Sequence, residues 1–231
     1  MDTDSHLVFD HVSPVFRVRR RFEAAARNLV RLPRPGEGSL DHLLPEACWQ
    51  ELSGGLPDPA GWFTALSQAT GVYFFPSREW PGRFVRYLGF LGIHRLLEAG
   101  AGRGYLTAAL GQLAMAHGMA FRAIDQGEGE FQSELPSCPE VIRGDVFAAA
   151  PAFRPEAVLY AWPPPGQSLA PLFTCSALRY IFVVGEPGGG ITGAREDWLT
   201  LPQRRSDILS RFSRGRTGPA PHQVTIFWRG G

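Results

Sequence analysis

The sequence predicts an α/β protein with a cofactor-binding turn. A short apolar strand runs into an acid and alternate glycines, at Glu98, Gly100, Gly102 and Gly104. Apolar residues then recur at helical spacing over 105–117. Two further short apolar segments end in Asp125 and Asp145. Strand, glycine turn and helix in this order are typical of a sheet that binds a ligand at its edge.

The spacing of the glycines separates two classes of cofactor. The run is G-x-G-x-G, with Tyr105 where the dinucleotide fingerprint G-x-G-x-x-G has its third glycine. Alternate glycines still allow a tight turn and close approach of a ligand, and the following helix offers unpaired N–H groups. The spacing therefore disfavours NAD.

The E-x-G-x-G-x-G turn resembles the first motif of the Rossmann-like methyltransferases that use S-adenosylmethionine (SAM). The resemblance continues in order from about Arg95 to Glu186. It implies a seven-stranded, mostly parallel sheet with an antiparallel C-terminal strand. It also implies a SAM-binding methyltransferase domain over residues 79–231, preceded by a helical extension or cap over residues 1–78.

The resemblance also implies which residues hold the cofactor. In that family the loop glycines pack against the amino-acid part of SAM, the preceding acid orients its ammonium group, and later strand-end residues hold the ribose and the adenine. These roles fall to Glu98, Gly100, Gly102, Gly104, Asp125, Asp145 and Val146. Taken singly, the glycine turn and the aspartates also suit ordinary strand-end connections, whereas their order along the chain favours SAM.

A proline-rich loop marks the expected acceptor site. Residues 161–166 read A-W-P-P-P-G after an apolar strand, at the edge where open α/β sheets place ligands. The loop looks like the N-P-P-Y loop of amino-methyltransferases, with Trp162 in place of the polar residue and Pro165 in place of the aromatic one. An indole donates one hydrogen bond and accepts none. Trp162 is therefore expected to position the acceptor; the alternative is a surface turn that Trp162 anchors in the core.

Further residues complete the predicted site. The residues expected to enclose the substrate are Tyr73, Trp80, Trp162 and Pro163, unless the aromatic ones fill the core of the added helices. Glu186 ends a later strand and precedes a glycine-rich loop at 187–193 that could close over a substrate. Glu186 is the candidate base and Trp162 the candidate positioning residue, although an activated methyl donor makes no base obligatory.

The two ends of the chain carry weaker signals. Residues 14–32 predict an amphipathic helix whose arginines form either a solvated face or a surface for an acidic partner. Ser77 is expected to cap a helix that runs to about Leu91. Residues 206–212 and 224–228 predict strands, with a Gly/Pro turn region at 213–221.

Composition argues against several classes of protein. The net charge of +1 supplies no overall field for nucleic acid or a membrane. All 23 Lys+Arg residues are arginine, which indicates a GC-rich, bacterial genome. The three cysteines lack C-x-x-C spacing, so neither a metal site nor a disulfide framework is expected. An acidic start without a following apolar run, and the lack of any stretch of ~18 apolar residues, predict a cytoplasmic protein.

Together these features predict a SAM-dependent methyltransferase that acts on a nitrogen or oxygen of a small molecule or peptide, with bacterial secondary metabolism as one setting. Two alternatives stay open: a SAM-binding scaffold or regulator that does not methylate, and a nucleic-acid methyltransferase. The sequence predicts no oligomeric state.

Overall fold

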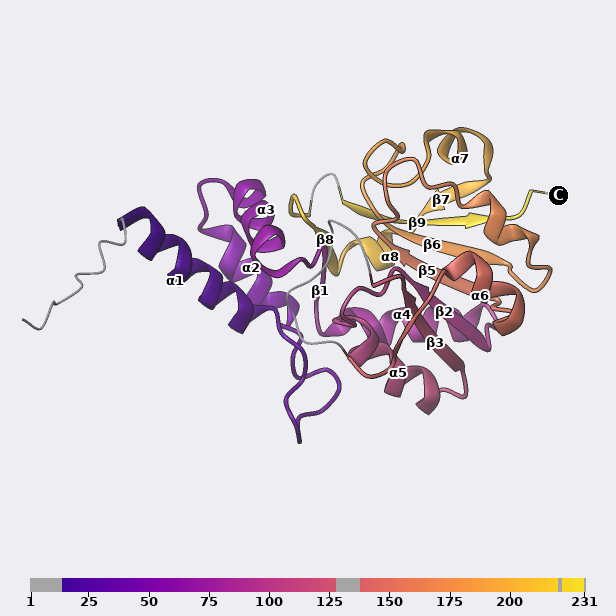
Figure 1. Cartoon of the computed structure of the whole chain (residues 1–231), viewed down its shortest axis with the longest axis horizontal. Helices are drawn as coiled ribbons and strands as arrows, with labels where there is room; N and C mark the ends of the chain where they lie inside the picture. The colour runs from indigo at the N-terminus through magenta and orange to yellow at the C-terminus, as the bar shows by residue number, and fades with distance from the viewer. Residues whose placement is uncertain (1–13, 128–137, 220–221, 231) are drawn as a thin grey trace, which may run out of the picture.

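A central β-sheet organises the protein (Figure 1), whose computed structural model describes residues 14–127, 138–219 and 222–230. Its strands are β2 (Arg95–Ala99), β3 (Ala120–Asp125), β4 (Val141–Arg143), β5 (Ala157–Ala161), β6 (Tyr180–Gly185), β7 (Gln203–Arg205) and β9 (Gln223–Trp228). They pair in the order β4-β3-β2-β5-β6-β9-β7 to form a seven-stranded sheet.

The strand directions confirm the predicted fold class. From β4 to β6 all neighbours are parallel, and β9 is antiparallel to β6 and to β7. The sheet is therefore mostly parallel with an antiparallel C-terminal strand. Its order reverses between β2 and β5, and the crevice at such a reversal is where open α/β sheets bind ligands.

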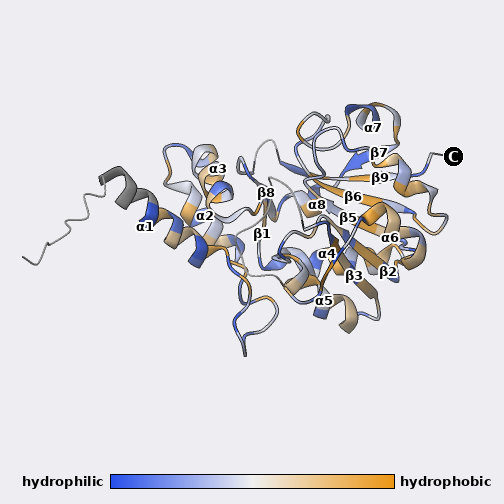
Figure 2. Ribbon diagram, in the orientation of Figure 1, coloured by the Kyte–Doolittle hydropathy of each residue, from blue (hydrophilic) through white to orange (hydrophobic). Residues whose placement is uncertain are grey.

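Helices cover both faces of the sheet. On one face lie α4 (Glu79–Phe90), α5 (Thr107–Ala116) and α8 (Asp207–Ser210), packed on side chains that include Leu96. On the other lie α6 (Val146–Phe153), the 3-10 helix η1 (Ala170–Thr174) and α7 (Arg195–Thr200), packed on side chains that include Leu97. Successive strand residues point to opposite faces. Because both faces are covered, the central strands β5 and β6 are strongly apolar (Figure 2).

Three N-terminal helices lie at one end of the molecule: α1 (Pro14–Leu29), α2 (Glu46–Gly54) and α3 (Pro59–Thr70). The amphipathic helix predicted over 14–32 is thereby confirmed. Trp49 and Phe63 share an apolar cluster with Tyr105 and Ala109, which belong to the sheet-bearing part of the chain. Within the described ranges, no helix has the length and apolar character to cross a membrane.

A second, two-stranded sheet joins the segment that follows the N-terminal helices to the C-terminal region. Strand β1 (Phe74–Pro76) pairs antiparallel with β8 (Ser213–Gly215). Arg214 of β8 is 5% exposed and forms an ion pair with Glu46 of α2 at 2.6 Å. The helical extension is therefore tied to the C-terminal segment by backbone pairing and by charge.

The C-terminal region differs from its prediction. The strand predicted at 206–212 is wrong: β7 ends at Arg205, and a helical turn follows in which Leu209 is fully buried and Ile208 is 58% exposed. The residues predicted as a turn from 213 instead begin with strand β8, and 220–221 lie outside the described residues. The predicted Ser77 cap is also wrong, because its hydroxyl donates to the Phe212 carbonyl (3.2 Å).

Candidate functional site

A cavity of about 300 Å³ opens at the carboxyl ends of β2, β3 and β5, at the reversal of strand order. Its walls include Glu98, Gly100, Gly102, Asp125, Tyr160 and Trp162. Ligand sites in open α/β sheets lie at this edge. The structure thus brings together most of the residues that the sequence predicts for the cofactor.

The three loop glycines serve different purposes. All have positive φ, at +63° for Gly100, +57° for Gly102 and +88° for Gly104. A Cβ on Gly100 would approach the Tyr160 ring to 2.9 Å, and one on Gly104 would overlap Cys138. Among the residues that the structure describes, a Cβ on Gly102 would meet no neighbouring atom within 4 Å. Gly100 and Gly104 therefore allow close packing of the protein, while Gly102 leaves space in the cavity wall for a ligand.

Asp125, at the end of β3, holds this loop in place. Its Oδ2 accepts a hydrogen bond from the Gly102 backbone N–H (2.8 Å), and its Oδ1 accepts one from the Gly127 N–H (2.7 Å). A carboxylate offers about four lone-pair sites. Asp125 lines the cavity and keeps capacity to accept further hydrogen bonds from a ligand.

Glu98 is a buried acid at the end of β2. It is 4% exposed, and its Oε2 accepts a hydrogen bond from the Thr107 hydroxyl (2.8 Å). The pKa of Glu98 is raised to about 8: burial is the main cause, the charge of Asp125 also raises it, and the Thr107 hydrogen bond lowers it in part. A cation placed beside this carboxyl would favour its ionised form and lower the pKa.

The raised pKa predicts how Glu98 affects stability with pH. Between the ordinary pKa of 4.5 and about 8 the folded state binds more protons at Glu98 than the unfolded state does. Stability from this group is therefore complete below pH 4.5 and is lost as the pH rises to about 8. Glu98→Gln cannot titrate, so its free energy of unfolding relative to wild type is expected to increase from pH 5 to pH 8, by on the order of 4 kcal/mol at most.

Urea unfolding at both pH values measures this difference. Exposed Glu51 of α2 offers the matched control, since Glu51→Gln should leave the pH dependence of wild type unchanged. Parallel pH curves for wild type and Glu98→Gln would contradict a raised pKa.

The residues predicted for the adenine lie at the start of α6. Asp145 is its N-cap, and Oδ1 accepts a hydrogen bond from the Phe147 N–H (2.8 Å). Val146 is buried and lines the cavity together with Gly144 and Phe147. Asp145 is exposed and flanked by lining residues without lining the cavity itself.

Trp162 contacts both the cavity and the core. Its side chain lines the cavity and also packs against the core cluster of the α4 face. Its φ of +54° is rare for a residue with a side chain, and its backbone N–H donates to the Val184 carbonyl (2.7 Å). Such strain persists where surrounding structure imposes it, often at functional sites. Indole Nε1 is buried and makes no hydrogen bond to any described residue.

Two of the predicted substrate and catalytic residues do not reach the cavity because hydrogen bonds hold them elsewhere. The Pro163 carbonyl accepts from the Gly193 N–H (3.0 Å), which leaves the next two prolines to line the wall. Glu186 Oε1 accepts from the Thr217 hydroxyl (2.9 Å).

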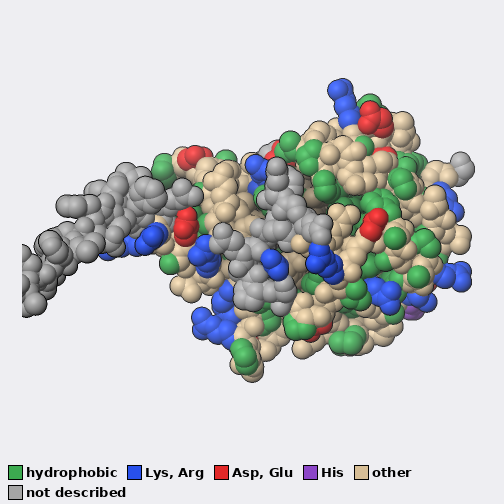
Figure 3. All heavy atoms as spheres, viewed as in Figure 1, with side chains coloured by type: hydrophobic (Ala, Val, Ile, Leu, Met, Phe, Trp, Pro, Cys, Tyr) green, Lys and Arg blue, Asp and Glu red, His purple; other side chains and the backbone are tan. Residues whose placement is uncertain are grey.

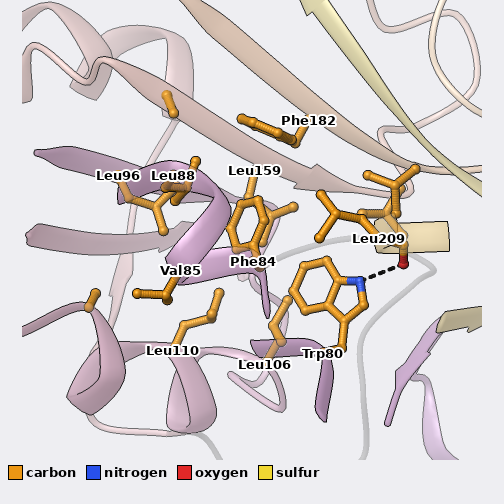
Figure 4. Packing of buried hydrophobic residues seen from close by; sticks show 14 of the residues in the cluster. Trp80, Phe84, Val85, Leu88, Leu96, Leu106, Leu110, Leu159, Phe182 and Leu209 are labelled. Atoms are coloured by element: carbon orange, nitrogen blue, oxygen red, sulfur yellow. Dashed lines mark hydrogen bonds between the residues drawn. The ribbon is translucent and has the colours of Figure 1, made fainter. Parts of the chain in front are cut away.

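The prediction that Trp80 contacts substrate is wrong. Trp80 is fully buried and its Nε1 donates to the Leu209 carbonyl at 2.9 Å (Figure 4). Its ring stacks on Phe84 with centroids 4.8 Å apart. Trp80 therefore belongs to the core between α4, α8 and the sheet, the alternative that the sequence left open. Tyr73, by contrast, lines the cavity, with its ring centroid 6.5 Å from that of Trp162.

A serine–histidine pair near the cavity is structural. The Ser213 hydroxyl lies 2.9 Å from His222 Nε2, and the two residues are 3% and 4% exposed. Burial, followed by the nearby Arg214 charge, lowers the pKa of His222 to about 3. A neutral, enclosed imidazole that does not line the cavity holds β8 to the core rather than activating a nucleophile.

Sequence reasoning missed Arg216 as a residue of the cavity wall. Its guanidinium carbon lies 5.8 Å from the Tyr73 ring centroid. The pairing of β1 with β8 brings the two residues together, and the glycine- and proline-rich sequence around Arg216 shows only a turn signal.

No protein-family model and no curated protein matches this sequence. Among solved structures, human N-acetylserotonin methyltransferase in complex with SAM shares 12% identity over 94% of this chain and 68% of that chain, with a TM-score of 0.41. A putative O-methyltransferase from Nostoc punctiforme shares 12% over 94% of this chain and 70% of that one, with a TM-score of 0.42. A putative caffeoyl-CoA O-methyltransferase from Staphylococcus aureus shares 9% over 80% and 99%, with a TM-score of 0.41.

These identities and TM-scores are low, so the fold is identified by the strand order and strand directions of this chain. By those two properties, and by the acid and glycine turn at the end of β2, the chain has the fold of the Rossmann-like SAM-dependent methyltransferases.

Proposed function

We propose that this protein is a SAM-dependent methyltransferase that acts on a nitrogen or oxygen of a small molecule or peptide. The observation that carries the proposal is the pairing of a buried acid with an open glycine. Glu98 is buried without a cationic partner among the described residues, and the adjoining Gly102 leaves space for a ligand. A ligand with an ammonium group fits both.

Residues that follow one another along the chain would hold successive parts of SAM. Glu98 would pair with the ammonium group, Asp125 would accept hydrogen bonds from the ribose hydroxyls, and Val146 would contact the adenine, with Asp145 beside it at the margin of the cavity. The fit is supported by the order of these residues, which follow β2, β3 and β4, because these three strands are neighbours in the sheet. SAM supplies an activated methyl group.

The chain would contribute orientation and exclusion of water. The Trp162 ring would form one wall of the acceptor site, and its rigid neighbours Pro164 and Pro165 line the cavity beside it. We assign no base, because Glu186 does not line the cavity. Residues 1–78 would act as a cap, since Tyr73 from this segment lies in the cavity wall.

One observation favours a SAM-binding protein without transferase activity. Trp162 occupies the position at which amino-methyltransferases carry a polar side chain. Its buried Nε1 cannot donate a hydrogen bond to a methyl-accepting substrate in this conformation. A nucleic-acid substrate has less support, because arginine side chains are dispersed over the face shown in Figure 3 instead of forming one continuous patch. Transfer of labelled methyl from SAM to extracted metabolites or to RNA separates these functions.

Calorimetric titration with SAM tests the proposal. Wild type should bind SAM and remain silent with NAD. Gly102→Ala should weaken SAM binding by about tenfold or more, because its Cβ enters the space left for the ligand.

Gly118 offers a matched control. It also has positive φ (+70°), a Cβ there would meet nothing within 4 Å, and it does not line the cavity. Both alanine variants bear the backbone strain of a left-handed conformation, roughly 1–2 kcal/mol, so only Gly102→Ala should lose SAM. Equal SAM affinities for the two variants, or saturation of wild type by NAD alone, would refute the proposed cofactor site.

A further inference from the structure

Arg216 places a positive charge in the cavity wall without a counter-charge. It follows β8 directly and is half-buried. Within the described ranges, no carboxylate lies within 4.0 Å of its guanidinium, and its neighbour Thr217 takes the nearby Glu186 as hydrogen-bond acceptor. The guanidinium contacts the Tyr73 ring instead.

The backbone around Arg216 is fixed. Gly215 and Gly218 exchange N–H to carbonyl hydrogen bonds, both at 2.9 Å. The Arg216 carbonyl accepts a hydrogen bond from the Thr64 hydroxyl at 3.2 Å. The backbone of this turn therefore needs little further ordering when the Arg216 side chain binds a ligand.

The contacts of Tyr73 place Arg216 at one end of the cavity. The residues proposed for SAM follow β2, β3 and β4, which are consecutive in the sheet. Trp162 follows β5, on the other side of β2. The Tyr73 ring lies near both the Trp162 ring (centroids 6.5 Å apart) and the Arg216 guanidinium (5.8 Å). Arg216 thus belongs to the end that the cofactor does not fill.

We propose, on the basis of the function proposed above, that the acceptor is a small aromatic compound with a carboxylate group. Arg216 pairs with the carboxylate through charge-assisted hydrogen bonds, in the planar geometry that guanidinium and carboxylate share. The rings of Tyr73 and Trp162, with Ile191 and Pro164, form an apolar wall for the aromatic ring. A neutral acceptor would leave a half-buried cation unpaired, and a cationic acceptor would be repelled.

Two probes that share a phenol ring, are of similar size and differ in charge test this inference. Wild type saturated with S-adenosylhomocysteine is titrated with para-hydroxybenzoate and with para-hydroxybenzyl alcohol, and binding is followed by ligand-observed NMR. The acid should bind about tenfold more tightly than the alcohol, or better, as expected for hydrogen bonds between charged groups. Arg216→Gln should abolish this preference and leave the affinity for S-adenosylhomocysteine within twofold of wild type.

Arg211→Gln is the matched control. Arg211 is exposed, lies over the Phe212 ring at 5.7 Å and does not line the cavity, so its loss should leave the preference intact. Equal binding of the two probes to wild type, binding of neither, or a preference that survives Arg216→Gln would overturn the inference.

The cofactor itself carries a carboxylate, which Arg216 could bind in place of the carboxylate of the acceptor. A third ligand distinguishes these two cases. Methylthioadenosine lacks the amino-acid part of SAM. If Arg216→Gln weakens S-adenosylhomocysteine and spares methylthioadenosine, the guanidinium serves the cofactor and the inference is wrong. If wild type binds no adenosyl ligand, the proposed function fails, and the same two probes on the free protein still decide whether Arg216 selects carboxylates.

Discussion

Asp125→Ala is expected to weaken SAM binding by at least tenfold and to lower the melting temperature of the ligand-free protein. The substitution removes the proposed acceptor of the ribose hydroxyls, and hydrogen bonds to a charged group contribute about 1.5–3 kcal/mol each. It also removes the acceptor of the Gly102 and Gly127 backbone N–H groups. The glycine loop would lose its anchor at the point where the ligand binds. Calorimetry measures the affinity, and thermal unfolding measures the stability.

Asp58→Ala separates the two effects. Asp58 is the N-cap of α3, accepts a hydrogen bond from the Gly61 N–H at 2.9 Å and does not line the cavity. Its loss costs about 1 kcal/mol of stability and should leave SAM affinity unchanged. If Asp125→Ala binds SAM as tightly as Asp58→Ala does, the ribose acceptor lies elsewhere.

Trp80→Ala is expected to lower the free energy of unfolding by about 3–5 kcal/mol, which corresponds to a fall of roughly 10 °C in melting temperature for a chain of this size. The ring is fully buried between Phe74 and Phe84, and its N–H pairs with the Leu209 carbonyl. Removal leaves a cavity and takes away one of the two hydrogen bonds that the Leu209 carbonyl accepts, the other coming from the Ser213 hydroxyl. Affinity for SAM, measured well below the new melting temperature, should stay within a few-fold of wild type.

Phe90 supplies the control on the same helix. It ends α4 and is 88% exposed, so Phe90→Ala should change the free energy of unfolding by less than about 0.5 kcal/mol. A stable Trp80→Ala variant with impaired SAM binding would instead show that Trp80 contributes to the ligand site.

Local sequence patterns are enough to predict the elements of this protein that depend on residues close together in the chain. The β2 strand, the glycine turn and helix α5 lie where the pattern predicts them, because apolar periodicity and glycine spacing encode them directly. The pattern treats the three glycines alike, however. Their different roles arise from Tyr160 and Cys138, which pack against two of them and leave Gly102 open.

The errors have a common physical cause in long-range pairing. Strands β1 and β8 are three residues each, too short to show a period. Only their mutual pairing makes them strands, and that pairing places Arg216 beside Tyr73. The place of Trp80 is ambiguous in the sequence for a related reason. The local sequence around an aromatic residue is the same whether its ring faces the cavity or the core.

The pairing of β1 with β8 also has a consequence for how the protein is made. Phe74 and Gly215 are partners although about 140 residues separate them, so the contact closes a very long loop. A ribosome releases the N-terminal helices and the central strands first. The wall between Tyr73 and Arg216 can form only after β8 has emerged. We expect the nascent chain to pair the parallel strands β2 to β6 before it acquires the pocket that selects an acceptor.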